Sequence, residues 1–314
     1  MTADLTAAPV DLAPPVLGSL SPSRAGDFMT CPLLFRFRTI DRLPSSPSPA
    51  ATRGTVVHAV LERLYDLPAL DRTLEAAGSL LRPEWDRLVE AEPGCADLFD
   101  DEPALTAWLG TARDLLAGYF SLEDPTRLEP VERERLVEVV LPGGLRLRGI
   151  VDRLDQAPSG DLRVVDYKTG RSPGPMFEGK ALFQMKFYAL VLWRTRGVVP
   201  RLLQLMYLGD REVLRYSPDE ADLLAVERKL LALWDAVEAA TARREFLPRP
   251  SRLCDWCDHQ ALCPSFGGTP PPFPDVVPGP GEPLPHQRRA VEAAAAQTST
   301  PTAGRPDVGA PENA

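Results

Sequence analysis

The 314-residue sequence has no run of eighteen apolar residues, so it contains no segment expected to span a membrane. Its N-terminus lacks a basic region followed by an apolar stretch, and no secretory signal peptide is expected. Only five cysteines are present, and this odd number favours metal or redox chemistry over a disulfide framework. Together these absences predict a soluble, cytoplasmic protein.

Positive charge is also in deficit. The sequence has 35 Lys and Arg against 44 Asp and Glu, a net charge of -9. This balance argues against a uniformly basic nucleic-acid binder, although a local groove can be positive on an acidic protein. Hydrophobic residues make up 44%, which is enough to bury the core of one large or two ordinary domains.

The two ends of the chain differ in composition from its middle. Residues 1–19 are rich in Ala, Pro and Leu without helical period, and residues 267–314 are rich in Pro, Gly, Ala and Thr. Both are predicted to be disordered. The folded body is then 20–266, and no linker divides it. Within it, residues 69–120 or thereabouts carry helical patterns broken by prolines, which we interpret as a helical insertion.

The second half of the body predicts a sheet. Strands are expected at 132–141, 145–155, 164–167 and 202–208, and the first two are joined by a Pro-Gly-Gly turn into a hairpin. A strongly apolar stretch at 179–193 predicts a helix between the last two strands. This order predicts an α/β fold with a mixed sheet flanked by helices.

Three charged residues in these strands suggest a chemistry. Asp166 and Lys168 are two apart on one strand, so their side chains project to the same side. The preceding strand carries Asp152, and a short turn folds the two strands together. Carboxylates are hard ligands for Mg²⁺ or Mn²⁺, and a neighbouring lysine can orient a water or offset charge on a phosphate. A bare D-x-K is often a surface ion pair, but with Asp152 the set is typical of phosphodiester cleavage.

A histidine further upstream is a candidate for the same site. His58 and Glu62 lie four apart on one face of a predicted helix at 54–65. Both could reach a metal or a phosphate. The alternative is a partly buried histidine that is hydrogen-bonded to its neighbour one turn away.

Three cysteines near the end of the body form a C-x₂-C-x₅-C motif at Cys254, Cys257 and Cys263. Their spacing indicates a metal site, and Cys31 is the best candidate for a fourth ligand. Spacing does not choose between zinc and an iron–sulfur cluster, and His259 could also ligate. Such a site would close a loop of over two hundred residues and act as a structural clasp.

These motifs, in their order, resemble the PD-(D/E)XK nuclease superfamily and its RecB-like exonuclease branch, which includes the AddB nuclease domain and the CRISPR adaptation nucleases. The resemblance covers most of the folded body. Its motifs are S-P-S-x(7)-C-P at 21–32, G-T-x-x-H at 54–58, G-I-V-D-R-L-D at 149–155, D-Y-K-T-G at 166–170, Q-x-x-x-Y at 184–188 and the cysteine motif.

The resemblance implies roles for individual residues. It implies that Lys168 assists the attacking water and that a [4Fe-4S] cluster, not zinc, occupies the cysteines. The implied ligands of Mg²⁺ or Mn²⁺ are His58, Asp152 and Asp166. The residues implied to position DNA are Gln184 and Tyr188. The implied cluster ligands are Cys31, Cys254, Cys257 and Cys263.

The implied function is a metal-dependent deoxyribonuclease, an exonuclease on single-stranded DNA or DNA ends, in DNA repair or recombination. No GxxxxGK[ST] motif is present, so a helicase would have to be a separate partner. One alternative is a non-catalytic DNA-binding or scaffold subunit of a helicase–nuclease complex. Another is a zinc-stapled protein with no nucleic-acid role.

Overall fold

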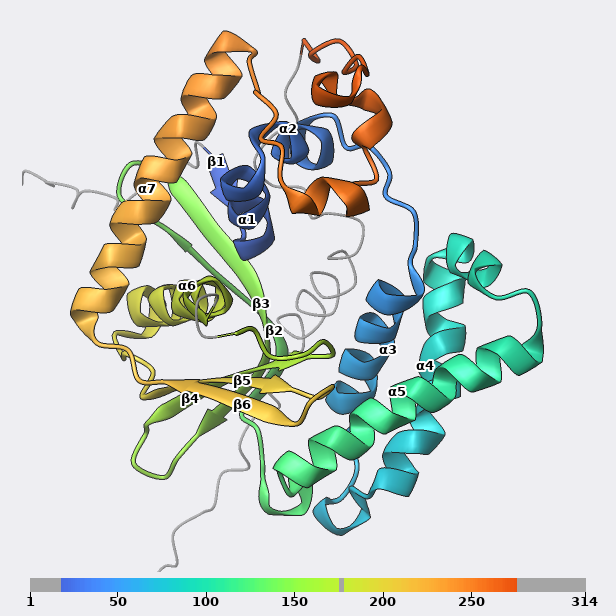
Figure 1. The fold of residues 1–314 in the computed structure, drawn as a ribbon. Helices are drawn as coiled ribbons and strands as arrows, with labels where there is room; N and C mark the ends of the chain where they lie inside the picture. The colour runs from blue at the N-terminus through green and yellow to red at the C-terminus, as the bar shows by residue number, and fades with distance from the viewer. Residues whose placement is uncertain (1–17, 175–177, 276–314) are drawn as a thin grey trace, which may run out of the picture.

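The computed structural model describes residues 18–174 and 178–275 (Figure 1). The α-helices are α1 Pro22–Thr30, α2 Pro32–Phe35, α3 Pro49–Leu64, α4 Leu74–Ala91, α5 Glu102–Leu122, α6 Glu178–Arg196 and α7 Glu220–Arg243. The strands are β1 Gly18–Leu20, β2 Glu132–Val140, β3 Leu145–Gln156, β4 Leu162–Lys168, β5 Leu202–Tyr207 and β6 Glu212–Tyr216. Shorter turns are the π-helical η1 Arg36–Ile40 and the 3₁₀ turns η2 Ala69–Asp71, η3 Pro93–Leu98, η4 Pro125–Arg127, η6 Arg252–Trp256, η7 Gln260–Leu262 and η8 Pro264–Phe266.

The described strands form one six-stranded mixed sheet in the order β1-β3-β4-β5-β6, with β2 paired to β3. The β1–β3 and β4–β5 pairs are parallel, and the other pairs are antiparallel. Gly143 and Gly144 close the β2–β3 hairpin with φ of 95° and 85°, which residues with a side chain rarely adopt. The predicted mixed α/β sheet flanked by helices is confirmed, and β1 and β6 are additions that the sequence pattern missed.

Strand β3 changes partners along one of its edges. Residues 145–147 pair with β1 and residues 153–156 pair with β4, whereas 148–152 pair with neither of these strands. On the other edge, β2 pairs along most of the length of β3. The sheet therefore opens between β1 and β4, and Asp152 lies at one end of this opening.

Each face of the sheet has its own hydrophobic core, because side chains alternate between faces along β4 and β5. Val164 and Leu205 pack with side chains of α1, α2, α6 and α7. Val165 and Met206 pack with side chains of α3, α4 and α5. Figure 1 shows these two groups of helices on different sides of the sheet. Burial on both faces explains why β4 and β5 are almost continuously apolar in sequence.

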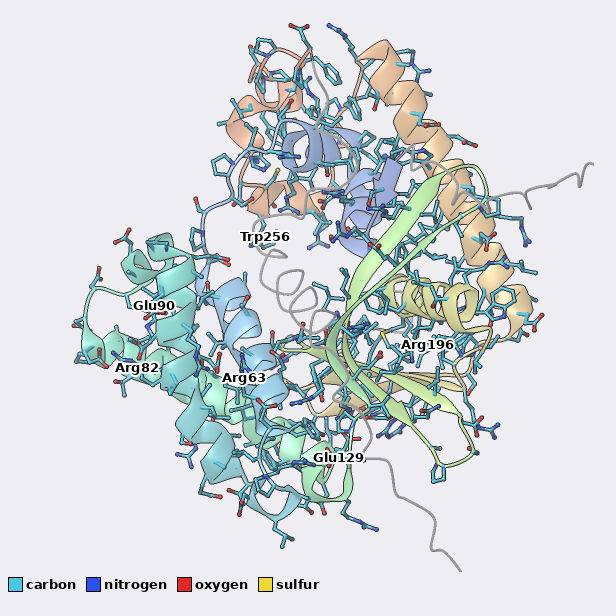
Figure 2. The ribbon with its side chains drawn as sticks, turned by 180° about the vertical axis from the view of Figure 1, so that it is seen from behind. Arg63, Arg82, Glu90, Glu129, Arg196 and Trp256 are labelled. Carbon is cyan, nitrogen blue, oxygen red and sulfur yellow. The ribbon has the colours of Figure 1, made fainter. Side chains whose placement is uncertain are left out.

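The predicted helical region at 69–120 contains α4 and most of α5, which pack with α3. Trp85, Phe99 and Trp108 form an aromatic cluster between them, with ring centroids 5.0–5.5 Å apart. Figure 2 shows Arg82 and Glu90 on the outer surface of this region. Within the described ranges, no helix combines the length and apolarity needed to cross a membrane.

Both predicted boundaries of the folded body need correction. Gly18 and Ser19 belong to β1, and a Cβ at Gly18 would overlap the ring of Trp234, so the ordered body begins before residue 20. At the other end, Phe273 stacks on Phe246 with centroids 6.0 Å apart, so the packed chain extends past residue 266. A three-residue strand and an isolated aromatic give no periodic signal. The disorder predicted for 1–17 and 276–314 lies outside the described residues.

Candidate active site

Two carboxylates lie where strands β3 and β4 separate. The pairing of these strands ends at Arg153 and Val165, and the next residues are Asp152 on β3 and Asp166 on β4. The backbone N–H of Tyr167 donates a hydrogen bond of 2.7 Å to Asp152 Oδ2, so this side chain bridges the separation. The structure therefore brings the two predicted acids to one place.

A third carboxylate, Glu134 of β2, was missed from the sequence. At the hairpin turn, Leu141 is hydrogen-bonded to Leu145. Continuing the same register along the two strands places Glu134 of β2 opposite Asp152 of β3. Glu134 has φ of 43°, in the left-handed region that residues with a side chain rarely adopt. Such strain recurs at functional sites. Because the Pro-Gly-Gly turn sets the register, the sequence did hold a signal for this residue.

Helix α3 brings His58 to these acids. Its Nδ1 lies 3.4 Å from Asp152 Oδ2 and 3.9 Å from Glu134 Oε1. Its Nε2 lies 2.9 Å from the carbonyl oxygen of Tyr167, which can only accept, so the ring proton sits on Nε2 and Nδ1 faces the acids. Within residues 18–174 and 178–275, His58, Glu134 and Asp152 are the one group of three whose possible ligand atoms all lie within 4.8 Å of one another. Asp166 lies outside this group.

The charges of the acids change the titration of His58. Burial alone would lower the pKa of His58, but the charges of Asp152, Glu134 and Asp166 outweigh it and raise this pKa to about 9. The imidazole is therefore protonated at neutral pH when no cation is bound. A metal ligand needs the free lone pair, so binding of a cation must displace one proton from His58.

A second polar chain starts at Asp166, whose side chain is almost completely buried. Lys168 Nζ lies 2.6 Å from Asp166 Oδ2 and donates a hydrogen bond of 2.9 Å to Gln184 Oε1. Gln184 Nε2 in turn donates to the hydroxyl of Tyr188 at 2.9 Å. A Cβ at Gly149 would lie 2.5 Å from the Tyr188 ring, so this glycine of β3 leaves room for the chain. Gln184 and Tyr188, predicted to position DNA, thus also hold the lysine.

The protonation of this chain follows from its surroundings. Burial and the charge of Asp152 raise the pKa of Asp166 to about 6, although Lys168 acts in the opposite direction. Burial would lower the pKa of Lys168, but the charges of Asp166 and Asp152 outweigh it and raise this pKa. Lys168 is therefore a cation at neutral pH. It can orient a water or stabilise an anionic oxygen, but it cannot accept a proton.

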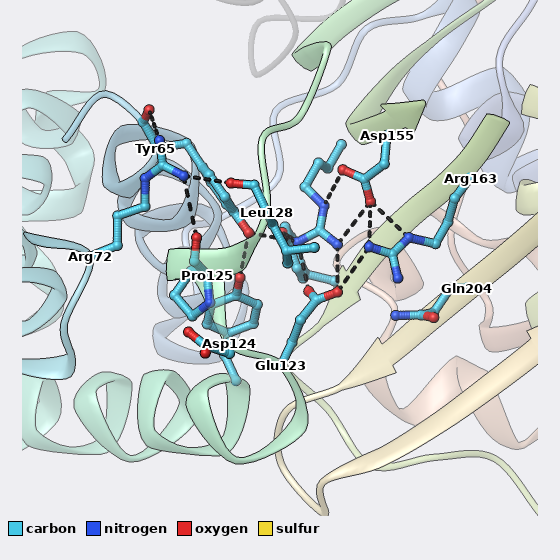
Figure 3. Close-up of polar contacts among 12 residues, drawn as sticks. Tyr65, Arg72, Glu123, Asp124, Pro125, Leu128, Asp155, Arg163 and Gln204 are labelled. Carbon is cyan, nitrogen blue, oxygen red and sulfur yellow. Dashed lines mark hydrogen bonds and ion pairs between the residues drawn. The ribbon is translucent and has the colours of Figure 1, made fainter. Parts of the chain in front are cut away.

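A buried arginine supports the strands that carry the acids. The Arg153 guanidinium donates to the hydroxyls of Tyr65 and Tyr167 at 2.9 Å, and to both carboxylate oxygens of Glu123 at 2.8 and 3.0 Å. Two further members of this network, shown in Figure 3, are Asp155 and Arg163. A buried charge is stable only when it is paired in this way. Because Arg153 and Tyr167 each follow one of the acids in sequence, the network fixes the backbone that presents both acids.

The acids open into a cleft of about 870 Å³. The polar residues of the site that line it are Glu134, Asp152, Lys168, Gln184 and Tyr188. Apolar lining comes from Met29 of α1, Phe183 of α6 and Leu253 of η6, and Lys229 of α7 adds a second cation. The cleft therefore extends from the acids to the segment that carries the C-terminal cysteines.

The cysteines predicted as ligands come together from both ends of the folded body. They line one cavity of about 50 Å³ together with His259, and their residues are Cys31, Cys254, Cys257 and Cys263. We call residues 251–268 with Cys31 the cysteine lobe. Its backbone consists of short 3₁₀ turns, and Trp256 projects from it with 80% of its surface exposed (Figure 2).

Two of the four sulfur atoms accept hydrogen bonds from backbone N–H groups. The donor and acceptor pairs are Arg249 and Cys31 at 3.4 Å, and Ser251 and Cys254 at 3.3 Å. Hydrogen bonds to ligand atoms are the usual surroundings of metal-bound thiolates, because they orient the ligand and tune the metal. Burial lowers the pKa of the His259 side chain, and the charge of Arg38 acts in the same direction.

The sequence is similar to those of known proteins. A sequence model of the PD-(D/E)XK nuclease superfamily matches residues 19–264. Gene 69 protein of Mycobacterium phage D29 is 26% identical over 279 residues, and Gene 69 protein of Mycobacterium phage L5 is 25% identical over 292 residues. Each alignment covers 78% of this chain and 96% of the relative.

A solved structure supports the fold. The crystal structure of a protein named "Putative exonuclease" from Eubacterium rectale superimposes with a TM-score of 0.52 at 13% sequence identity. The superposition covers 77% of this chain and 88% of that chain. At this identity the similarity concerns the fold alone. The superfamily match, however, spans well over half of the sequence, and the chain therefore belongs to the PD-(D/E)XK nuclease superfamily.

Proposed function

We propose that this protein is a divalent-metal-dependent deoxyribonuclease that acts as an exonuclease on single-stranded DNA or DNA ends. The observation that carries the proposal is the convergence of His58, Glu134 and Asp152 within 4.8 Å, beside the Asp166–Lys168 pair and at the wall of a large cleft. A surface ion pair would have no need of three further ligand groups or of a buried Asp166.

The ligand atoms fit a divalent cation. Two carboxylates offer hard oxygen ligands suited to Mg²⁺ or Mn²⁺, and one imidazole nitrogen shifts the preference from Mg²⁺ towards Mn²⁺. When bound, such an ion lowers the pKa of a water and neutralises charge on a phosphate. His58, Glu134 and Asp152 would hold it, with the Tyr167 carbonyl fixing the His58 ring and the Tyr167 N–H fixing Asp152.

Lys168 has the properties of an electrostatic and orienting group. Its ammonium is held on one side by Asp166 and on another by Gln184, so both contacts are in place before substrate binds. A preorganised donor of this kind stabilises charge that develops on the phosphate, and losing one such donor typically costs about 3–4 kcal/mol of transition-state stabilisation. Asp166 acts by holding Lys168 and by contributing negative charge next to Asp152.

The cleft favours an unpaired strand as substrate. Its apolar surface includes Met29, Phe183 and Leu253, and Lys229 provides a cation near the ring of Phe183, 4.9 Å from its centroid. Sites for single-stranded nucleic acid combine aromatic or apolar surfaces for bases with scattered cations for phosphates. Gln184, which also lines the cleft, is placed to contact the backbone of the strand.

We further propose that the cysteine lobe holds a [4Fe-4S] cluster, as expected for the RecB-like branch. Four thiols around one cavity match the ligand number of such a cluster. The preference for a [4Fe-4S] cluster over a zinc ion rests on the resemblance to the RecB-like branch. A role in DNA repair or recombination, with a separate helicase supplying the strand, completes the proposal.

The test is cleavage of labelled single- and double-stranded DNA by anaerobically purified protein with Mg²⁺ or Mn²⁺, beside the Asp166→Ala variant. We expect metal-dependent cleavage by the parent, faster on single strands, and none by the variant. If the parent binds DNA but does not cleave it with either metal, the non-catalytic subunit becomes the better account.

A further inference from the structure

The cavity lined by the four cysteines contains one more polar group that has no partner in the structure. His259 is 4% exposed and lines this cavity. Its Nε2 is buried and has no hydrogen-bond partner among the described atoms. Buried polar groups in folded proteins are almost always hydrogen-bonded, so a missing partner is the expected explanation.

The surroundings of the ring limit where that partner can be. On one side, His259 packs edge-to-face against Phe37, with centroids 5.5 Å apart, and a phenyl ring offers no lone pair. Apolar lining of the cavity comes from Leu33, Leu34 and Phe266. Polar lining comes from Thr30, Ser251 and Gln260; the Ser251 hydroxyl accepts from the backbone N–H of Leu253, and the Gln260 amide donates to the carbonyl of Cys254. The other side-chain acceptors that line the cavity are the four cysteine sulfurs.

The backbone N–H groups of Arg249 and Ser251 already donate to the sulfurs of Cys31 and Cys254, but no donor to Cys263 is among the hydrogen bonds of the described residues. A [4Fe-4S] cluster with four cysteines has no free iron site for a fifth ligand. The histidine is therefore better suited to donate its N–H than to coordinate iron.

We propose that His259 is a positioning residue that donates its Nε2–H to a sulfur atom of the cluster and so sets the reduction potential of that cluster. This inference rests on the proposed [4Fe-4S] cluster, and it adds a specific role for one side chain. A hydrogen bond to a cluster sulfur stabilises the more negative, reduced state, and hydrogen bonds to sulfur are among the recognised controls of cluster potential.

The experiment uses the full chain, purified anaerobically, as parent, His259→Leu and His259→Gln. Leucine removes the donor and keeps the site apolar, whereas glutamine keeps an N–H donor. The midpoint potential of each is measured by redox titration followed by EPR. We expect the reduced state to be about tenfold less stable relative to the oxidised state in His259→Leu, a fall of about 59 mV for one electron, with at least partial restoration in His259→Gln.

A second measurement is made on the parent protein, with one variant as a control. Pulsed EPR of the reduced parent, with histidine labelled with ¹⁵N, should show weak coupling to one histidine nitrogen. This coupling should persist in the control variant His58→Leu. That variant removes the histidine beside Asp152 and Glu134 and keeps His259. Strong coupling typical of a direct iron ligand, or no coupling at all, would overturn the proposal, as would equal midpoint potentials in iron-replete parent and His259→Leu.

Absence of the proposed [4Fe-4S] cluster would give a different experimental result. If the parent contains no iron and has no visible absorbance after anaerobic purification, the proposed cluster is wrong, and the role of His259 is wrong with it. The nuclease proposal is tested separately, by measuring metal-dependent cleavage of DNA by the same preparation.

Discussion

The acids on the sheet and the cysteine lobe border one cleft, which Ser251 and Leu253 of the lobe help to line, but the two regions are held in place by different means. Asp152, Glu134 and His58 are fixed by strand register, by a helix and by hydrogen bonds to the Tyr167 backbone. The cysteine lobe consists of 3₁₀ turns around a cavity, with exposed Leu253, Trp256 and Phe266 at its surface. The first region is held by regular secondary structure and hydrogen bonds, whereas the second consists of short turns that the proposed cluster would hold together.

Because of this difference, we expect substitutions in the first region to change the cleavage reaction and substitutions in the second region to change the stability of the fold. A substitution among the acids should change the reaction and leave the fold intact, because the sheet and its two cores do not depend on a cation. A substitution among the cysteines should loosen the contact between the two ends of the folded body, because their shared site joins positions over two hundred residues apart. Four predictions test this separation, from the largest expected effect on the reaction to the smallest.

Asp166→Asn should lower the rate of DNA cleavage roughly 10³-fold or more, because it removes the charge that holds Lys168 and leaves shape unchanged. Single-turnover rates at saturating Mn²⁺ measure this effect. The matched control is Asp161→Asn on the exposed turn between β3 and β4, which should cleave at the parental rate. A variant at position 166 within tenfold of the parent would contradict the role given to Asp166.

The affinity for the cation should rise with pH, by about tenfold per unit up to the pKa of His58 at about 9, because each ion displaces one proton. Between pH 6 and 8 this amounts to about a hundredfold. For the protein without a cation, the pH dependence runs in the opposite direction. The raised pKa of His58 stabilises the metal-free fold, and this contribution to the free energy of unfolding is fully present below pH 6.5 and is lost as pH rises through 9. Calorimetry in buffers of different ionisation enthalpy measures the released proton, and pH-independent affinity would show that His58 is not a ligand.

Glu134→Gln should weaken Mn²⁺ binding about 10- to 100-fold, because one carboxylate of the three-residue group becomes neutral. The loss should show mainly as a higher Mn²⁺ concentration needed for cleavage, with the maximal rate largely recovered. Glu138→Gln, at an exposed position of the same strand, is the control. Equal Mn²⁺ dependence of the two variants would remove Glu134 from the site.

Cys257→Ser should have the smallest direct effect on cleavage, within about threefold of the parent at low temperature, but it should lose iron and melt several degrees earlier. Iron analysis and thermal unfolding measure both effects. Cys95→Ala is the control, because Cys95 is buried in the α3–α5 core and should keep the parental iron content. Full iron content in the Cys257 variant would rule out Cys257 as a ligand.

Much of the fold could be predicted because its strands carry strong local patterns. The apolar β4 and β5 and the Pro-Gly-Gly hairpin are recognisable from residue types alone. Strand β1 has three residues, and β6 is a short edge strand, so neither has enough length for a period. The ends were misplaced for a related reason: Gly18 and Phe273 are ordered by contacts with Trp234 and Phe246, which are distant in sequence.

The candidate site was predicted unevenly. Asp152, Asp166 and Lys168 follow from alternation on adjacent strands, and their convergence is seen in the structure. Glu134 was missed because it lies in a run of alternating charges, ERER, where residue type carries no information and only register does. The buried Arg153 network could not be predicted, because it depends on tyrosines and a glutamate from three separate elements.

The most direct test measures iron content and Mn²⁺-dependent cleavage of single-stranded DNA on the same anaerobic preparations of the parent, Asp166→Asn and Cys257→Ser. The account predicts full iron and cleavage slowed roughly 10³-fold or more for Asp166→Asn, and depleted iron with near-parental cleavage at low temperature for Cys257→Ser. Parental cleavage by Asp166→Asn would contradict the assignment of the reaction to the acids of the sheet.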